Sequence, residues 1–190
     1  MGSLYSIRPL NSVLLDTFSS DRASLKEPAG PQGQFYHRGG RRPALELIDN
    51  SLDVSLASFL DRPLFAFLAQ QSPDGPRVSP LWFLWADDRL WHIAQLDGRS
   101  YPERIRQDSR VAVGIVDFDT STGRVEHVGI RGEAQLRDYD TERADRLLAK
   151  YLGDDPSDWP ERFLAVDAEG YRLVEVTPET VVARDQSYPV

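Results

Sequence analysis

The hydrophobic positions in the middle of the chain form short runs that are separated by turn residues. Apolar residues dominate 64–69, 77–85 and 90–94, and the runs are divided by Ser72-Pro73-Asp74-Gly75-Pro76 and by a tight turn at 86–89. Runs of this length between Gly, Pro, Asp and Ser are typical of strands that are joined by turns. The pattern therefore predicts an antiparallel meander from residue 64 to residue 94.

A second hairpin is predicted further along the chain. Valine and isoleucine alternate with smaller residues over 110–118, which is the period of a half-buried strand. The turn at 119–123 leads into a long strand over 125–137. Within it, Gly129 and Gly132 indicate bulges or a close approach of two backbones.

Two helices are predicted beside these strands. Apolar residues at helical spacing from Leu52 to Leu60 indicate a short amphipathic helix that ends before Pro63 and covers one end of the barrel. The second helix starts at Asp140 or Thr141, either of which can cap it, and stops at Gly153. Two β-branched segments complete the sheet and cover 171–176 and 180–183. The predicted fold class is mainly β: a barrel of about six strands with two or three flanking helices.

The first 43 residues differ from the rest of the chain. They are polar, show no sustained period, and contain the Gly- and Pro-rich stretches 28–33 and 38–43. Such a composition buries too little apolar surface to order itself. The sequence therefore predicts a disordered or extended segment over 1–43 and a single domain over 44–190.

Composition narrows the classes of function. The chain has 22 Lys and Arg against 30 Asp and Glu, a net charge of −8, so broad binding to nucleic acid or to an anionic membrane surface is not expected. The absence of cysteine excludes disulfides, thiolate metal sites and cysteine nucleophiles. No apolar run reaches the roughly 20 residues that span a bilayer, and no secretory signal is recognised, so a cytoplasmic protein is expected. The three histidines are too scattered to predict a metal site.

One short segment has the residue types of an anion site. Arg99, Ser100 and Arg104 lie where a strand gives way to a helical turn, so backbone N–H groups, a hydroxyl and two guanidinium groups can converge on one phosphate. Arg77, at the start of a neighbouring strand, is a further candidate. The alternative is that these are surface arginines of an arginine-rich protein.

Several landmarks of this stretch occur in a recognisable order. They are the turn Asp74-Gly75-Pro76-Arg77, the segment Trp82-Phe83-Leu84-Trp85, the segment from Arg99 to Ile105, and Asp108-Ser109-Arg110-Val111-Ala112-Val113. In order, spacing and residue type they resemble the pyridoxamine 5′-phosphate oxidase-like FMN-binding split-barrel superfamily. The likeness extends from about residue 53 to residue 188.

The resemblance implies a flavin-binding split β-barrel that forms a homodimer with the cofactor at the interface. It implies that the flavin phosphate is held by Arg77 and by the segment that contains Arg99, Ser100, Tyr101 and Arg104. The flavin ring would be lined by Val78, Ser79, Pro80, Ala94 and Gln95 and bounded by Trp82. Because many members of the superfamily have a lysine where Tyr101 stands, the cofactor stays open: FMN first, with a deazaflavin coenzyme, FAD or haem as alternatives.

The function implied by the resemblance is that of an FMN-dependent oxidoreductase acting on an unknown small organic substrate. The flavin carries the redox step in such proteins, so no acid or base from the chain need be posited. Two other classes are compatible with the same fold. One is a carrier or sensor that binds flavin, deazaflavin or haem without turnover, and the other is a dimeric interaction protein without a cofactor.

Overall fold

The computed structural model describes residues 45–96 and 101–190, and the segment 1–43 predicted to be disordered lies outside them. Within the described residues eight strands form one sheet, in the order β3-β2-β6-β7-β8-β5-β4, with β1 paired to β8. The strands are β1 (Glu46–Asn50), β2 (Ala66–Gln70), β3 (Arg77–Leu81), β4 (Leu84–Ala86), β5 (Arg89–Gln95), β6 (Arg110–Asp119), β7 (Arg124–Arg137) and β8 (Tyr171–Asp185). The helices are α1 (Leu56–Leu60), α2 (Tyr101–Gln107), α3 (Thr141–Leu152), the 3-10 helix η1 (Pro156–Asp158) and α4 (Glu161–Leu164). The mainly β fold is confirmed, with more strands than the six predicted.

Strand β8 joins the two halves of the sheet. One of its edges pairs with β7 over nearly its whole length, while its other edge pairs first with β5 and then, in parallel, with β1. The prediction of two separate strands over 171–176 and 180–183 is therefore wrong. Pro178 lies opposite Gly132 next to a register shift, and this irregularity accommodates a proline within a continuous strand.

Gly132 is required at that register shift. A Cβ atom at this position would lie 2.1 Å from the backbone oxygen of Thr177, whereas a Cβ at Gly129 would meet nothing within 4 Å. We expect Gly132→Ala to lower the free energy of unfolding by about 2–4 kcal/mol, because two paired strands must move apart. The matched control Gly129→Ala should change it by less than about 0.5 kcal/mol. Urea denaturation of both variants checks this, and equal losses would contradict it.

The segment predicted as one strand over 77–85 is two strands with a break at Trp82 and Phe83. Helix α3 accounts for the break. Its Tyr151 hydroxyl accepts a hydrogen bond from the Phe83 N–H at 3.1 Å, and Lys150 Nζ donates to the Phe83 carbonyl at 3.1 Å. Because α3 takes up these backbone groups, Phe83 leaves the ladder.

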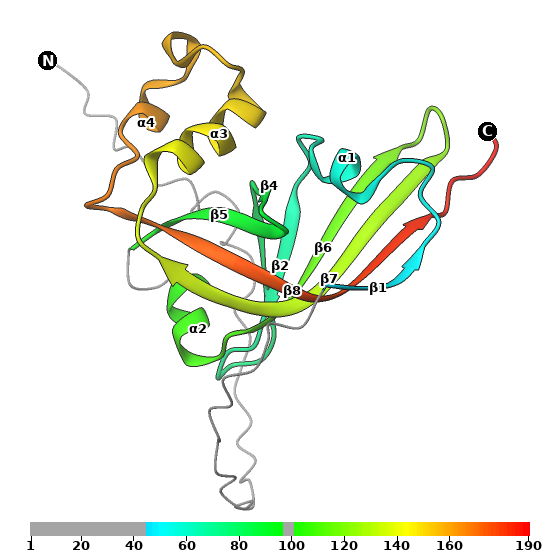
Figure 1. Ribbon diagram of the computed structural model, residues 1–190, viewed down its shortest axis with the longest axis horizontal. Helices are drawn as coiled ribbons and strands as arrows, with labels where there is room; N and C mark the ends of the chain where they lie inside the picture. The colour runs from blue at the N-terminus through cyan, green and yellow to red at the C-terminus, as the bar shows by residue number, and fades with distance from the viewer. Residues whose placement is uncertain (1–44, 97–100) are drawn as a thin grey trace, which may run out of the picture. The chain divides into compact units, whose positions relative to one another are not determined.

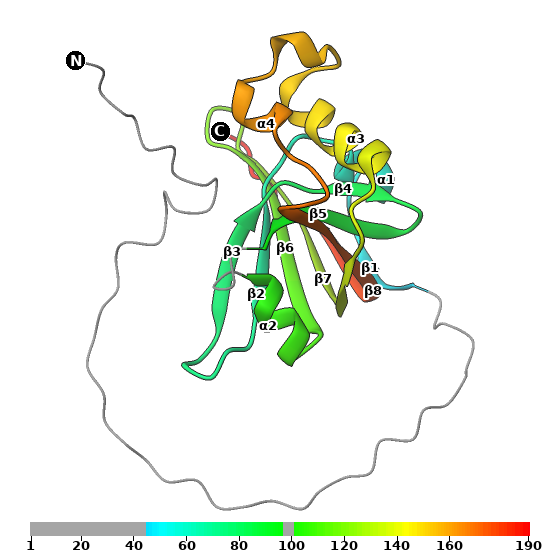
Figure 2. The same ribbon diagram turned by 90° about the vertical axis from the view of Figure 1, so that its left-hand side faces the viewer.

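The helices lie on both sides of the sheet. In Figure 1, α3 and α4 lie above it and α2 lies below, and Figure 2 shows α2 close to β2. Helix α3 is confirmed and runs from its Asp140 cap to Gly153, where φ is 96°. The first predicted helix is present but shorter than the pattern from Leu52 indicated, because Ser55 caps α1 at Leu56. Phe59 and Leu60 of α1 are fully buried in the main core cluster. No helix in the described ranges is long and apolar enough to cross a membrane.

Candidate functional site

Helix α2 brings Arg104 onto the ends of β2 and β3. The Arg104 guanidinium donates from Nη2 to Ser79 Oγ at 3.3 Å and from Nε to Gln70 Oε1 at 3.2 Å. Arg77 lies directly opposite Gln70 in the β2–β3 ladder. The structure thus brings together three predicted residues, Arg77, Ser79 and Arg104, around Gln70.

The charge at this point is not balanced by acidic groups. Among residues 45–96 and 101–190, no carboxylate pairs with Arg77 or Arg104. Burial lowers the pKa of Arg104 from its ordinary value, and the nearby positive charge of Arg77 lowers this pKa further. Two guanidinium groups that repel each other beside a hydroxyl favour binding of an anion the size of a phosphate.

Gln70 is a residue that the sequence analysis missed. Its side chain is only 4% exposed, and its amide nitrogen donates to the Tyr101 carbonyl at 3.0 Å. Gln70 follows Ala66 and Leu68 on the inward face of β2, where both of those residues are fully buried. A polar residue at an inward position of an apolar strand was the signal that could have found it.

Tyr101 fixes the start of α2 and supplies no charge. Its side chain is buried, and its hydroxyl donates to the Ile93 carbonyl of β5 at 2.8 Å. Burial raises the pKa of Tyr101 above its ordinary value, so the phenol stays neutral. The site therefore lacks the positive charge of a lysine at this position, and Arg77 and Arg104 are the cations that the structure describes there.

The other predicted site residues are distributed differently. Val78 and Pro80 lie on the face of β3 opposite to Arg77 and Ser79, because side chains alternate along a strand. Within the described residues β3 has a strand neighbour on one side only, so no strand pairs with its other backbone edge there. Gln95 is half-buried at the end of β5. Arg99 and Ser100 lie outside the described residues.

Two residues predicted to lie at the flavin ring, Ala94 and Trp82, pack against other side chains of the protein. Ala94 is fully buried in the main core cluster, which leaves its side chain no surface for a ligand. The Trp82 ring stacks on Tyr151 at 4.6 Å and on Phe163 at 5.3 Å between ring centroids. Trp82 lies in the break between β3 and β4, where strand alternation no longer predicts the direction of a side chain.

A cavity of about 510 Å³ lies between α2, the end of β7 and the start of β8. Three arginines line it, but each already has partners. Arg106 pairs with Glu103 at 2.7 Å, Arg137 pairs with Glu175 at 2.5 Å, and Arg172 donates to two backbone carbonyls. An anion would have to compete with these partners, so the pair Arg77 and Arg104 is the stronger anion site.

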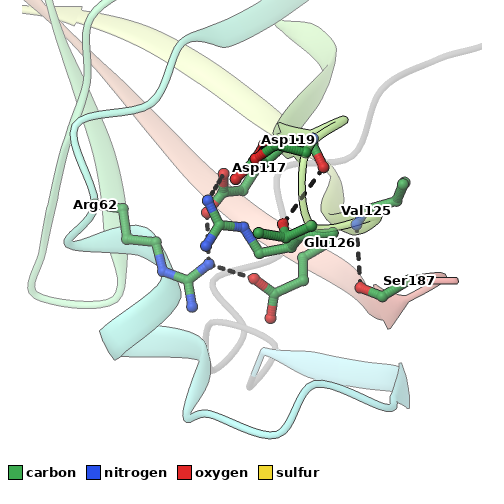
Figure 3. Close-up of polar contacts among 9 residues, drawn as sticks. Arg62, Asp117, Asp119, Val125, Glu126 and Ser187 are labelled. Carbon is green, nitrogen blue, oxygen red and sulfur yellow. Dashed lines mark hydrogen bonds and ion pairs between the residues drawn. The ribbon is translucent and has the colours of Figure 1, made fainter. Parts of the chain in front are cut away.

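A second polar cluster lies at the opposite end of the sheet (Figure 3). Asp117 of β6 and Glu126 of β7 face each other in the ladder, and Arg62 binds both carboxylates, with 2.8 Å to Asp117. Arg124 adds a contact of 3.2 Å to Asp117. Every charge in this cluster has an opposite partner. The cluster therefore ties Arg62, two residues after the end of α1, to the β6–β7 hairpin and offers no free group to a ligand.

One face of the sheet is apolar and exposed. Five large side chains on or beside β2, β3 and β6 have exposed fractions between 45% and 58%. They are Phe65, Phe67, Val78, Val116 and Phe118. We call this surface the outer face. Phe67 lies opposite Gly114, and Gly114 lies opposite Gly129, so the outer face is flat beside Phe67.

Solved structures with the same arrangement of strands and helices superpose on most of this chain. The conserved hypothetical protein Rv2991 from Mycobacterium tuberculosis superposes with a TM-score of 0.59 and 19% identity, over 74% of this chain and 89% of that one. An F420 reductase superposes with a TM-score of 0.52 and 23% identity, over 68% of this chain and 98% of that one. The chain has the split-barrel fold. In this split barrel, Arg77 and Arg104 lie at the end of the sheet that α2 covers. No protein family profile and no curated protein matches the sequence.

Proposed function

We propose that this split barrel binds FMN and is a flavin-dependent oxidoreductase that acts on a small organic substrate. The observation that carries the proposal is the pair Arg77 and Arg104: Arg104 bonds to the neutral side chains of Gln70 and Ser79, the charge of Arg77 acts on it, and no carboxylate among the described residues pairs with either arginine. A phosphate monoester carries between one and two negative charges near neutral pH, and it would satisfy both guanidinium groups.

The residues of the chain bind and orient the cofactor. Arg77 and Arg104 donate to the phosphate oxygens, and Ser79, two residues after Arg77 on β3, adds a hydroxyl. The free backbone edge of β3 at Val78–Pro80 faces the flavin ring, and Arg99 and Ser100 remain part of the proposed phosphate grip. When bound, the flavin supplies the electron-transfer chemistry, while the protein supplies position and electrostatics.

We propose that the working unit is a homodimer with the cofactor at its interface. The outer face supports this, because exposed apolar side chains on three adjacent strands are characteristic of a surface that another chain covers. Val78 belongs to the outer face, whereas Arg77 and Ser79 lie on the opposite face of β3, so a second copy would reach the phosphate site around the free edge of this end strand. Sedimentation velocity should give twice the 21.5 kDa mass of one chain. A monomer at all concentrations would contradict the dimer.

The deazaflavin coenzyme F420 is the second candidate ligand. One solved neighbour is named as an F420 reductase, and Tyr101 leaves this site without a lysine charge. FAD and haem are the remaining candidates. They differ from FMN in the group presented to the arginines, since FAD offers a pyrophosphate and haem offers carboxylates.

The absorption spectrum of the purified protein tests the proposal. We expect flavin bands in the blue and near-ultraviolet after reconstitution with FMN and gel filtration, and turnover of a nicotinamide donor by the reconstituted protein. Titrations with FMN, riboflavin, F420 and FAD should give the highest affinity for FMN. Riboflavin should bind about a thousandfold more weakly, because it lacks the phosphate that Arg77 and Arg104 bind. Preference for F420 would favour the second candidate. A protein that takes up none of these ligands would instead belong to the class of dimeric interaction proteins without a cofactor.

A further inference from the structure

We infer that Gln70 is a positioning residue that aims Arg104 at the anion and leaves its charge available; this rests on the proposed function. Gln70 contacts three parts of the site at once. Its amide oxygen accepts from Arg104 Nε, its amide nitrogen donates to the Tyr101 carbonyl at the start of α2, and its backbone lies opposite Arg77. The side chain is thus fixed at both ends, and it can hold the guanidinium in one orientation.

Burial makes this orientation specific. Gln70 is 4% exposed, so water does not replace its hydrogen bonds when a partner is lost. Arg104 otherwise contacts Ser79, at 3.3 Å. Without the amide oxygen of Gln70, the Arg104 guanidinium would lose the hydrogen bond at Nε that fixes the orientation of its plane. An unoriented guanidinium binds phosphate less well, because bidentate contacts require both N–H groups to point at the anion.

The neutrality of Gln70 is the second part of the inference. Other partly buried arginines of the chain are held by carboxylates, as Arg62 is by Asp117 and Glu126. A glutamate at position 70 would hold Arg104 equally well, but it would neutralise the guanidinium and repel a phosphate. Glutamine keeps the hydrogen bond to Arg104 and leaves the positive charge of the guanidinium available to a phosphate. This explains why a buried amide, and not a carboxylate, stands between two arginines.

Three variants separate positioning from a merely structural role. Gln70→Met keeps the volume and removes both hydrogen bonds, Gln70→Glu keeps the contact with Arg104 and adds a negative charge, and Gln71→Met is the control on the exposed neighbouring residue. The measured quantity is the ratio of FMN affinity to riboflavin affinity, read by quenching of flavin fluorescence. We expect Gln70→Met to lower this ratio about tenfold, Gln70→Glu to lower it at least as far, and Gln71→Met to leave it unchanged.

A double-mutant cycle with Arg104→Gln tests whether Gln70 acts through Arg104. In the Arg104→Gln background, Gln70→Met should have no further effect on the ratio. An equal loss of FMN and riboflavin affinity in Gln70→Met, or an undiminished effect without Arg104, would overturn the inference. Failure of the proposed function is distinguishable, because it is read from the wild-type protein alone. If the wild-type protein binds no flavin, its Tm is measured with and without inorganic pyrophosphate. Pyrophosphate should raise the Tm of the wild type and should not raise the Tm of Gln70→Met. A wild-type protein that pyrophosphate does not stabilise would then overturn the inference too.

Discussion

Replacing Arg77 and Arg104 together by glutamine should lower the affinity for FMN about a thousandfold and leave the affinity for riboflavin nearly unchanged. Hydrogen bonds to charged groups contribute about 1.5–3 kcal/mol each, so each single substitution should cost about 10–100-fold. The selectivity follows from the chemistry of the two ligands, since riboflavin shares the ring of FMN and lacks the phosphate. Isothermal titration with both ligands gives the two affinities directly.

Arg106→Gln is the matched control for this experiment. Arg106 lies on the same helix two residues after Arg104, but it pairs with Glu103 and is half exposed. The Arg106→Gln variant should bind FMN with the same affinity as the wild type. If the double variant keeps its preference for FMN over riboflavin, the phosphate does not bind at Arg77 and Arg104. If Arg106→Gln loses the preference instead, the cavity beside α2 is the anion site.

The stability of the unliganded protein gives a second readout. Because the charge of Arg77 disfavours the charged form of Arg104, removing Arg77 relieves a repulsion in the free protein. Arg77→Gln should therefore leave Tm without ligand unchanged or slightly higher, while it weakens stabilisation by FMN. A binding group that costs stability in the free state is common at functional sites. A marked fall in the ligand-free Tm would indicate a structural role for Arg77.

Local patterns in the sequence were sufficient for most of the sheet. The alternation in 110–118, the Asp140 cap and the Gly153 stop each involve neighbours in sequence, so β6 and α3 were predicted close to their observed bounds. Strand β1 was missed because Glu46–Asn50 shows no alternation. It pairs with β8, more than 130 residues later in the chain, and propensity cannot report such a partner.

The same distinction applies to the candidate site. Arg77 and Arg104 were singled out from residue type and from the family resemblance, and the structure brings them together. Gln70 was missed because its importance depends on Arg104, which lies 34 residues later in the sequence. Trp82 was placed at the flavin ring by the family resemblance. A continuous strand was predicted over 77–85, but helix α3 interrupts it and packs Tyr151 against the indole.

A large loss of stability should follow from Arg62→Met at the other end of the sheet. Arg62 is the residue that binds both Asp117 and Glu126, and its own pKa is raised chiefly by the hydrogen bond to Glu126 (Figure 3). Without Arg62, two largely buried carboxylates face each other across the ladder with only the half-exposed Arg124 nearby. We expect the free energy of unfolding to fall by about 3 kcal/mol. For a domain of this size, Tm should drop by about 6–12 °C.

Three comparisons make this prediction specific. Arg184→Met breaks an exposed ion pair with Asp49 and should cost less than about 1 kcal/mol. Adding Glu126→Gln to Arg62→Met should restore part of the lost free energy of unfolding, because one of the two facing negative charges is removed. FMN affinity should not change, since Gln70 pairs with Val111 at the far end of β6 from Asp117. A deficit that Glu126→Gln does not reduce would show that lost packing, not charge, explains the effect.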